Sequence, residues 1–224
     1  MTASVRGDGQ EDGIDTRKIE LIMQLRKRGI RDADVLSAME RVPRDLFVPK
    51  TFSDQAYDDN ALPLECGQTI SQPYVVAYMT EMLGLGPRMK VLEVGTGSGY
   101  QTAVLSHLCR RVYSIERYRT LLRDASPRFL KLDLTNVTTK TADGSKGWPE
   151  QAPFDRIIVT AAAEEVPFEL IDQLKIDGWM IIPVGRTNED QALFRIKKTE
   201  QGLEQEKLLP VRFVPLVEGL PQEV

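Results

Sequence analysis

Three glycines at alternate positions, Gly95, Gly97 and Gly99, are the clearest chemical signal in the chain. They follow a short apolar stretch at residues 91–94 and precede a second apolar segment at residues 102–108. This pattern predicts a strand, a tight turn and a helix. Glycine has no Cβ, so the backbone of such a turn can bend sharply and approach a ligand closely. We expect the turn to hold a nucleotide; a turn that only closes a strand–helix unit is the alternative.

Two carboxylates are spaced to complete a nucleotide pocket. Glu116 ends a predicted strand and follows Gly95 by 21 positions, where α/β nucleotide folds place an acid that accepts both ribose hydroxyls. A surface acid at a strand end is the alternative. Asp143 and Gly144 follow the predicted strand at residues 136–141, and this acid is placed to accept the adenine amino group. Because the turn lacks a G-K-[ST] pattern, the pocket favours adenosine without phosphates, and S-adenosylmethionine fits better than NAD.

Hydroxyl groups gather at a predicted helix start before the glycine turn. Ser71 is the predicted N-cap, Thr69 precedes it, and Pro73 lies in the first turn of a helix that runs to residue 83. A helix N-terminus presents unpaired N–H groups and favours negative charge. We therefore predict that Ser71 Oγ and these N–H groups bind a substrate carboxylate, with ordinary capping as the alternative. The sole histidine, His107, lies among apolar residues and is expected to be structural.

Strand and helix patterns alternate along the chain. They predict an α/β fold with a doubly wound, mostly parallel sheet of the Rossmann-like type, finished by an antiparallel C-terminal hairpin. We expect a disordered tail at residues 1–14 and a single domain at residues 15–224, with a helical lead-in at residues 15–83. Helices are expected near 15–28, 32–41, 71–83, 102–108, 118–132 and 167–174, and strands near 91–94, 112–116, 136–141, 157–163, 179–185, 192–197 and 208–217.

Composition excludes several classes of protein. The 224 residues carry a formal net charge of -4, which does not favour nucleic acid or an anionic membrane as a partner. Arg26, Lys27 and Arg28 form the densest basic cluster and are expected on a solvated helix face. No apolar run approaches the length of a membrane span, and the first residues do not resemble a secretory signal. Two distant cysteines predict neither a disulfide framework nor a metal site, so we expect a cytoplasmic protein. We also expect a monomer.

The segment ADGSKGWPEQAPFDRI at residues 142–157 resembles the signature of the protein-L-isoaspartate (D-aspartate) O-methyltransferase family. In that signature, D-G-x-x-G and an aromatic residue are followed by A-P-F-D-x-I. The resemblance is closest to bacterial members and covers the chain from about residue 19 to 216. Similar segments follow the family's order: GQTISQP at 67–73, VLEVGTGSGYQTA at 91–103, LKIDGWMIIPVG at 174–185 and VRFVPL at 211–216.

The resemblance implies a repair enzyme with S-adenosyl-L-methionine as cofactor and S-adenosyl-L-homocysteine as product. Its substrates would be age-damaged proteins and peptides, methylated on the α-carboxylate of L-isoaspartyl and, more weakly, D-aspartyl residues. The ester then closes to a succinimide, whose hydrolysis returns part of the material to aspartate. At the matching positions, the expected site comprises catalytic and substrate-binding Ser71 and cofactor-binding Thr69, Gly95, Thr96, Gly97, Gly99, Glu116, Asp143 and Gly144.

The expected chemistry requires few catalytic groups. A carboxyl with a pKa near ~4 is already ionised near neutral pH, so alignment replaces a general base. We also expect residues 211–216, with Val214, to offer backbone to an extended peptide, although an edge strand that only completes the core is the alternative. Alternative hypotheses for the function of the chain are a methyltransferase acting on a small-molecule carboxylate, a catalytically inactive S-adenosylmethionine-binding module, and a NAD-linked dehydrogenase.

Overall fold

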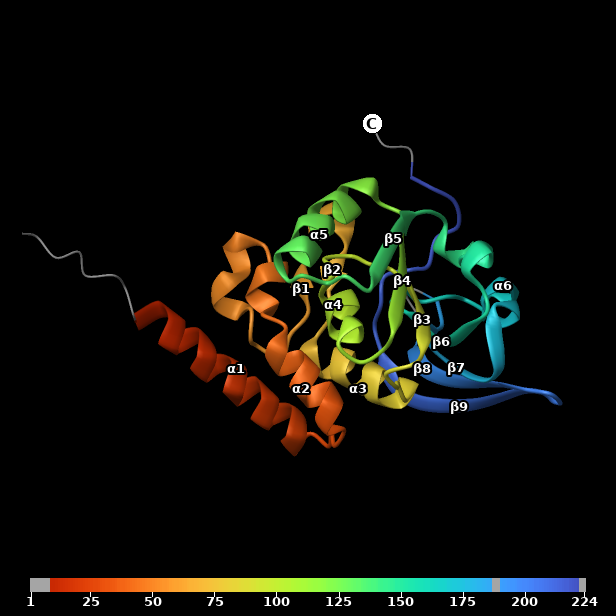
Figure 1. Cartoon of the computed structure of the whole chain (residues 1–224), viewed down its shortest axis with the longest axis horizontal. Coiled ribbons are helices and arrows are strands. Elements are labelled where there is room, and N and C mark those ends of the chain that lie inside the picture. Colours follow the sequence, from red (N-terminus) through yellow and green to blue (C-terminus); the bar gives the residue numbers. More distant parts are fainter. Residues whose placement is uncertain (1–8, 187–189, 222–224) are drawn as a thin grey trace, which may run out of the picture.

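A mixed sheet forms the centre of the protein in a computed structural model that describes residues 9–186 and 190–221 (Figure 1). Within that part of the chain it has seven strands, in the order β5-β4-β3-β6-β7-β8-β9. The strands are β3 (Lys90–Val94), β4 (Arg111–Glu116), β5 (Val137–Thr141), β6 (Phe154–Val159), β7 (Leu174–Val184), β8 (Gln191–Thr199) and β9 (Gly202–Val211).

The predicted fold class is confirmed by the strand directions. Strands β5, β4, β3, β6 and β7 run parallel, and β8 and β9 continue the sheet as antiparallel neighbours. The last strand differs from the prediction, because β9 ends at Val211 and does not include most of the 208–217 segment. Beyond Val211, Pro215 forms an isolated bridge with Ala162, so this segment lies against a loop.

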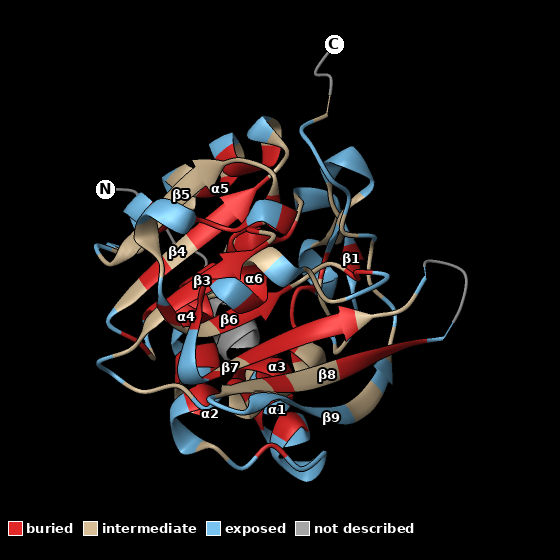
Figure 2. Cartoon of the chain, turned by 90° about the vertical axis from the view of Figure 1, so that its right-hand side faces the viewer, coloured by how far each residue is buried: buried red, intermediate tan, exposed pale blue. Residues whose placement is uncertain are grey.

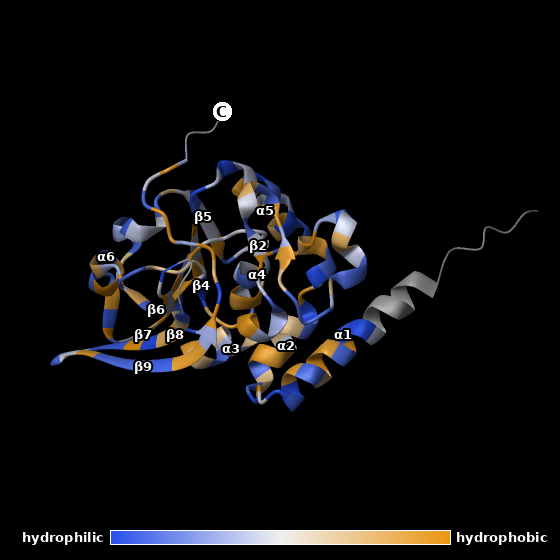
Figure 3. Ribbon diagram, turned by 180° about the vertical axis from the view of Figure 1, so that it is seen from behind, coloured by the Kyte–Doolittle hydropathy of each residue, from blue (hydrophilic) through white to orange (hydrophobic). Residues whose placement is uncertain are grey.

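Apolar side chains alternate between the two faces of the sheet, as the two-residue period of a strand requires. In β3, Val91 packs with Met79 and Leu83 on one face, whereas Leu92 packs with Phe154 on the other. Figure 2 shows β3, β4 and β6 mostly in the colour of buried residues. The outermost strand β9 is mostly exposed and hydrophilic (Figure 3), which disfavours pairing of this edge with another chain.

Helices cover both faces of this sheet. They are α1 (Gly9–Lys27), α2 (Ala33–Arg41), α3 (Pro73–Leu83), α4 (Tyr100–Ser106), α5 (Arg119–Lys131) and α6 (Phe168–Asp172). Helices α1 to α3 lie on the side of the molecule opposite α6 (Figure 1). Among the described helices, none combines the length and the apolar character that a membrane span needs.

Two helix starts differ from the predictions. Helix α1 begins at Gly9, before the predicted start at residue 15, and residues 1–8 of the predicted tail lie outside the described residues. Helix α4 begins at Tyr100 because Gly99, with φ of 91°, is its N-cap, and it ends with His107 as its C-cap. The predicted span of 102–108 was therefore displaced toward the C-terminus.

The lead-in between α2 and α3 packs as a unit against α4. Its short strands β1 (Leu62–Pro63) and β2 (Thr69–Ile70) pair antiparallel, and its Phe47 ring meets the Tyr100 ring edge-on at 5.7 Å. This contact connects the lead-in to the first turn of α4. It therefore places β2 and the following residues beside the glycine turn.

The basic residues at the end of α1 are exposed, as the prediction of a solvated basic face requires. Arg28 in addition forms an ion pair with Asp59, and its guanidinium carbon lies 3.6 Å from the centroid of the Tyr74 ring. Its charge therefore connects the end of the N-terminal helix to the start of α3.

Candidate active site

A cavity lies at the carboxyl ends of the parallel strands, where α/β sheets bind ligands. Five stretches of chain supply most of its wall, and four of them lie outside the glycine turn. The cavity is lined by residues 68–71, 94–98, 115–118, 160–161 and 213–217, together with Val76, Tyr100, Gln101 and Gly144.

Most of the predicted site residues share this wall. Gly99 and Asp143 are not part of it, and each has a packing or hydrogen-bonding role outside the cavity. His107, expected to be structural, is also not part of the wall. The predicted residues that line the cavity are Thr69, Ser71, Gly95, Thr96, Gly97, Glu116, Gly144 and Val214.

The first two glycines of the turn serve different purposes. Gly95 has φ of +100°, and a Cβ there would lie 2.2 Å from Thr160 Oγ1, so a side chain cannot fit. The Thr160 hydroxyl bonds the carbonyl oxygens of Val94 and Gly95, at 3.0 and 2.9 Å, which holds the turn against β6. Gly97 has φ of +54° and a Cβ there would meet no atom within 4 Å. Gly97 thus leaves the backbone accessible from the cavity.

Gly99 is required for packing. A Cβ at Gly99 would lie 2.6 Å from Phe129 Cε1 of α5. The α5 residue Arg128 also donates from Nη1 to the carbonyl oxygen of Ser98 at 2.9 Å. Helix α5 therefore packs directly against the turn, and the absence of a side chain at Gly99 leaves room for the Phe129 ring.

Glu116 is held rigidly beside the turn. Its Oε2 accepts a hydrogen bond from the Gly97 N–H at 2.8 Å, and its Oε1 accepts one from the Tyr118 N–H at 2.9 Å. Burial raises the pKa of Glu116, and the backbone N–H groups oppose that rise only in part. Each oxygen keeps acceptor capacity, because a carboxylate offers about four lone-pair sites. The side chain can therefore accept further hydroxyl groups at the cavity wall.

A buried polar network behind the turn has no counterpart in the sequence predictions. Glu93 of β3 is fully buried, and its Oε2 accepts hydrogen bonds from Thr102 Oγ1 and Ser114 Oγ, both at 2.5 Å. Thr96 Oγ1 lies 2.6 Å from Ser114 Oγ. Burial raises the pKa of Glu93 to about 8. An acid inside an apolar strand pattern, next to a glycine turn, is the sequence signal that could have identified Glu93.

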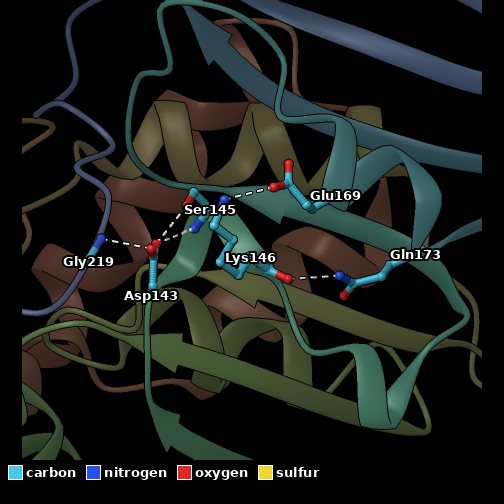
Figure 4. Close-up of polar contacts among 6 residues, drawn as sticks. All are labelled: Asp143, Ser145, Lys146, Glu169, Gln173 and Gly219. Carbon is cyan, nitrogen blue, oxygen red and sulfur yellow. Dashed lines mark hydrogen bonds and ion pairs between the residues drawn. The ribbon is translucent and has the colours of Figure 1, made fainter.

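Asp143 binds protein groups with both carboxylate oxygens (Figure 4). Oδ1 accepts from the Ser145 N–H at 2.9 Å and from Ser145 Oγ at 2.7 Å, and Oδ2 accepts from the Gly219 N–H at 2.7 Å. Partial burial favours a higher pKa for Asp143, but the hydrogen bonds from Gly219 and Ser145 outweigh it and lower the pKa. Asp143 therefore caps a short turn and tethers the segment after β9, while its neighbour Gly144 lines the cavity.

The start of α3 differs from the prediction in a way that affects substrate binding. The N-cap is Gln72, not Ser71, and the Gln72 side chain makes no capping hydrogen bond. Pro73 has no N–H, and the Tyr74 N–H donates to Asp59 Oδ1 at 2.8 Å. The prediction that the N–H groups of this helix start bind a substrate carboxylate is therefore wrong for Tyr74, whose N–H is already capped by the internal carboxylate of Asp59. Ser71 itself is half-buried in the cavity wall.

The wall segment at residues 213–217 is fixed by bonds to the loop after β6. The Val214 carbonyl accepts from the Ala162 N–H at 2.8 Å, and the Leu216 N–H donates to the Ala162 carbonyl at 2.7 Å. This edge of the segment is thus occupied, so Val214 cannot offer that carbonyl to a peptide. Val214 contributes to the wall through its position beside the cavity.

Arg117 is a cavity residue that sequence reasoning did not name. It follows Glu116 directly, and its Nε is buried without a hydrogen-bond partner. Its guanidinium carbon lies 5.2 Å from the centroid of the Tyr118 ring. The sequence signal that could have identified Arg117 is its position immediately after Glu116, the acid predicted to bind a ribose.

Comparison with known proteins assigns a family to this arrangement. A model of the family described as protein-L-isoaspartate(D-aspartate) O-methyltransferase matches residues 16–221. The chain belongs to this family. A protein-L-isoaspartate O-methyltransferase from Parvibaculum lavamentivorans is 67% identical over 208 residues, which are 92% of this chain and 94% of the relative.

Two solved structures share the family's name and the fold. One protein-L-isoaspartate O-methyltransferase superposes with a TM-score of 0.81 at 33% identity; the match covers 88% of this chain and 65% of that one. Another, described as this enzyme from Plasmodium falciparum in complex with S-adenosyl-L-homocysteine, gives 0.77 at 27% identity and covers 91% of this chain and 99% of that one. The family resemblance inferred from residues 142–157 is confirmed.

Proposed function

We propose that this protein transfers a methyl group from S-adenosyl-L-methionine to the α-carboxylate of L-isoaspartyl residues and, more weakly, D-aspartyl residues in damaged proteins and peptides. The family match over residues 16–221 carries the proposal. The cavity supports it, because most of the residues proposed to bind donor and acceptor line one continuous wall.

The residues of the cavity fit the proposed cofactor. Gly97 leaves its backbone open, and Glu116 holds a fixed carboxylate next to it with acceptor capacity for a ribose. We propose that Thr69, Gly95, Thr96, Gly97, Glu116 and Gly144 hold the cofactor, because all six line the cavity. When bound, S-adenosyl-L-methionine supplies a sulfonium methyl group, and its transfer to a carboxylate oxygen leaves a methyl ester and S-adenosyl-L-homocysteine.

The acceptor side of the site requires alignment rather than proton transfer. The isoaspartyl carboxylate arrives ionised, so no residue has to remove a proton. We propose that Ser71 Oγ, in the cavity wall, donates a hydrogen bond to this carboxylate and orients one oxygen toward the methyl group. Holding the reacting atoms in line contributes up to ~7–11 kcal/mol in well-oriented reactions.

The remaining proposals concern partners and location. We propose a monomer that acts in the cytoplasm on polypeptides, without nucleic acid or membrane as a partner. The net charge of -4 supports the absence of a nucleic-acid role.

One experiment tests the proposed function directly. The protein is incubated with methyl-labelled S-adenosyl-L-methionine and either an isoaspartyl peptide or the matching aspartyl peptide. We expect base-labile methyl ester on the isoaspartyl peptide and background label on the aspartyl peptide. Equal labelling of both, or labelling of neither, would contradict the proposal.

A further inference from the structure

Asp59 contacts the start of α3, directly after Ser71, although it is not part of the cavity wall. Its Oδ1 accepts the Tyr74 N–H at 2.8 Å, and its Oδ2 accepts Gln72 Nε2 at 3.1 Å. The Asp59 backbone carbonyl accepts the same Gln72 Nε2 at 2.8 Å. Asp59 thus supplies the cap that the Gln72 side chain does not provide.

One arginine holds the Asp59 side chain in this place. Arg28, next to the end of α1, pairs with Asp59 Oδ2, and its guanidinium also lies over the Tyr74 ring. The fully buried Arg44 holds the next residue, because its Nη2 donates to the backbone carbonyl of Asn60 at 3.2 Å. The Asp59 side chain in the ion pair is only 15% exposed. The carboxylate is therefore partly shielded from solvent and paired with Arg28, so it can define where α3 begins.

The position of Ser71 depends on this arrangement. Ser71 lies between β2, where Ile70 pairs with Leu62, and Gln72, which Asp59 holds. Strand β2 has only two residues, so Ser71 also depends on the fixed start of α3 for its position. A displacement of about 1 Å in a group that orients a reacting atom can cost on the order of a hundredfold in rate.

We propose that Asp59 is a positioning residue for methyl transfer, which fixes Gln72 and Tyr74 and thereby holds Ser71 Oγ at the acceptor side of the cavity. The inference rests on the proposed function. Asp59 makes no contact in the cavity wall that we assign to the cofactor. Its loss therefore lowers turnover and leaves binding of S-adenosyl-L-homocysteine unchanged.

The first test compares Asp59→Ala with Asp58→Ala, which removes the exposed neighbouring carboxylate. We expect kcat on an isoaspartyl peptide to fall about tenfold or more in Asp59→Ala, with the Kd of S-adenosyl-L-homocysteine within about twofold of the unsubstituted protein. Asp59→Asn keeps an oxygen for the Tyr74 N–H but loses the ion pair with Arg28, so its kcat should lie between those of Asp59→Ala and the unsubstituted protein. If the two alanine variants have equal kcat, or if Asp59→Ala weakens cofactor binding as much as kcat, the inference is wrong.

The second test asks whether Asp59 acts through Ser71. In a Ser71→Ala background, Asp59→Ala should change kcat less than about twofold, because residues that act through one another are not additive. Fully additive losses would overturn the inference. If Asp59→Ala does not fold, Arg28→Gln serves in its place, with the expectation of lower kcat at unchanged cofactor affinity. Failure of the unsubstituted protein to methylate the isoaspartyl peptide would instead contradict the proposed function.

Discussion

Ser71 lies between two residues, Ile70 and Gln72, that are each fixed by a hydrogen-bonding partner elsewhere in the chain. Ile70 pairs with Leu62 in the small sheet, and Gln72 donates to Asp59. The Ser71 side chain therefore has no capping role in α3, which agrees with the acceptor role that we propose for it. The separation between the N-cap and the cavity residue was not evident from the sequence, in which Ser71 resembled an N-cap.

Ser71→Ala should lower turnover on an isoaspartyl peptide. The variant removes one hydrogen bond to a charged acceptor, which is worth roughly 1.5–3 kcal/mol. Steady-state kinetics with the peptide measures the loss, and equilibrium titration with S-adenosyl-L-homocysteine should show an unchanged Kd. Ser71→Thr, which keeps the hydroxyl, is the matched control. Equal losses in turnover and cofactor affinity would argue against an acceptor role.

Glu116→Ala should weaken cofactor binding. It removes the carboxylate that accepts the Gly97 and Tyr118 N–H groups, and with it one or two hydrogen bonds to the ribose, each worth roughly 1.5–3 kcal/mol. Calorimetric titration with S-adenosyl-L-homocysteine measures the change. Glu40→Ala, at an exposed position, provides the control. An unaltered dissociation constant in Glu116→Ala would refute the ribose assignment.

Glu93 should make folding stability depend on pH. Its pKa is about 8 in the folded protein against 4.5 for the ordinary side chain, so between these values the folded state binds more protons than the unfolded state. Stability is then full below pH 4.5 and decreases as pH rises toward 8, by on the order of 1 kcal/mol per pH unit. Glu93→Gln mimics the protonated form, so its denaturant unfolding should lose this slope. Parallel pH profiles for the two proteins would contradict the prediction.

Among individual residues, sequence reasoning succeeded where a local pattern determines the contact. Gly95, Gly97 and Glu116 follow from the strand–turn–helix spacing. It failed where the partner comes from a distant segment: Gly219 binds Asp143, Asp59 binds the start of α3, and Phe129 requires Gly99. Such partners are set by the tertiary arrangement, which residue spacing does not encode.

At the scale of the elements, the turn between β3 and α4 combines two kinds of glycine. Gly97→Ala adds a methyl group in open space and costs mainly the left-handed strain, about 1–2 kcal/mol. Gly99→Ala also collides with Phe129, so its free energy of unfolding should fall by about 1–3 kcal/mol more. Urea unfolding of the two variants measures the difference. Similar stability of both variants would show that α5 can adjust to the added methyl.

The sequence predicts best those helices and strands that have a regular apolar period. Strands β3 and β4 and helix α5 have regular apolar periods, and the structure places them close to the predicted residues. The segment after β9 did not become a strand, because Gln191 and Ala162 bind its backbone instead. An apolar run with one proline, such as residues 211–216, does not reveal which neighbour will pair with it.

At the scale of the whole molecule, one buried side chain joins the sheet to the cavity wall. Gln191 of β8 accepts the Phe213 N–H with Oε1 at 2.7 Å and donates from Nε2 to the Phe213 carbonyl at 3.3 Å. The amide thus replaces a neighbouring strand for this residue. It fixes the beginning of the wall segment at residues 213–217.

Gln191→Leu should therefore loosen the cavity wall. Phe213 loses both partners, and each unsatisfied buried group costs about 1–3 kcal/mol. We expect faster hydrogen exchange at the Phe213 amide and weaker binding of S-adenosyl-L-homocysteine. Gln205→Leu, at an exposed position of β9, is the control. Unchanged exchange at Phe213 would show that Gln191 does not carry this restraint.

The segments that line the cavity are synthesised in sequence order, and the last of them lies near the C-terminus. Residues 213–217 leave the ribosome after every other residue that lines it. A nascent chain that stops before them already contains the glycine turn and Glu116, yet its cavity lacks one side. The ability to retain the methyl donor is thus acquired late in translation, and incomplete chains should not compete with finished enzyme for the cellular pool of that donor.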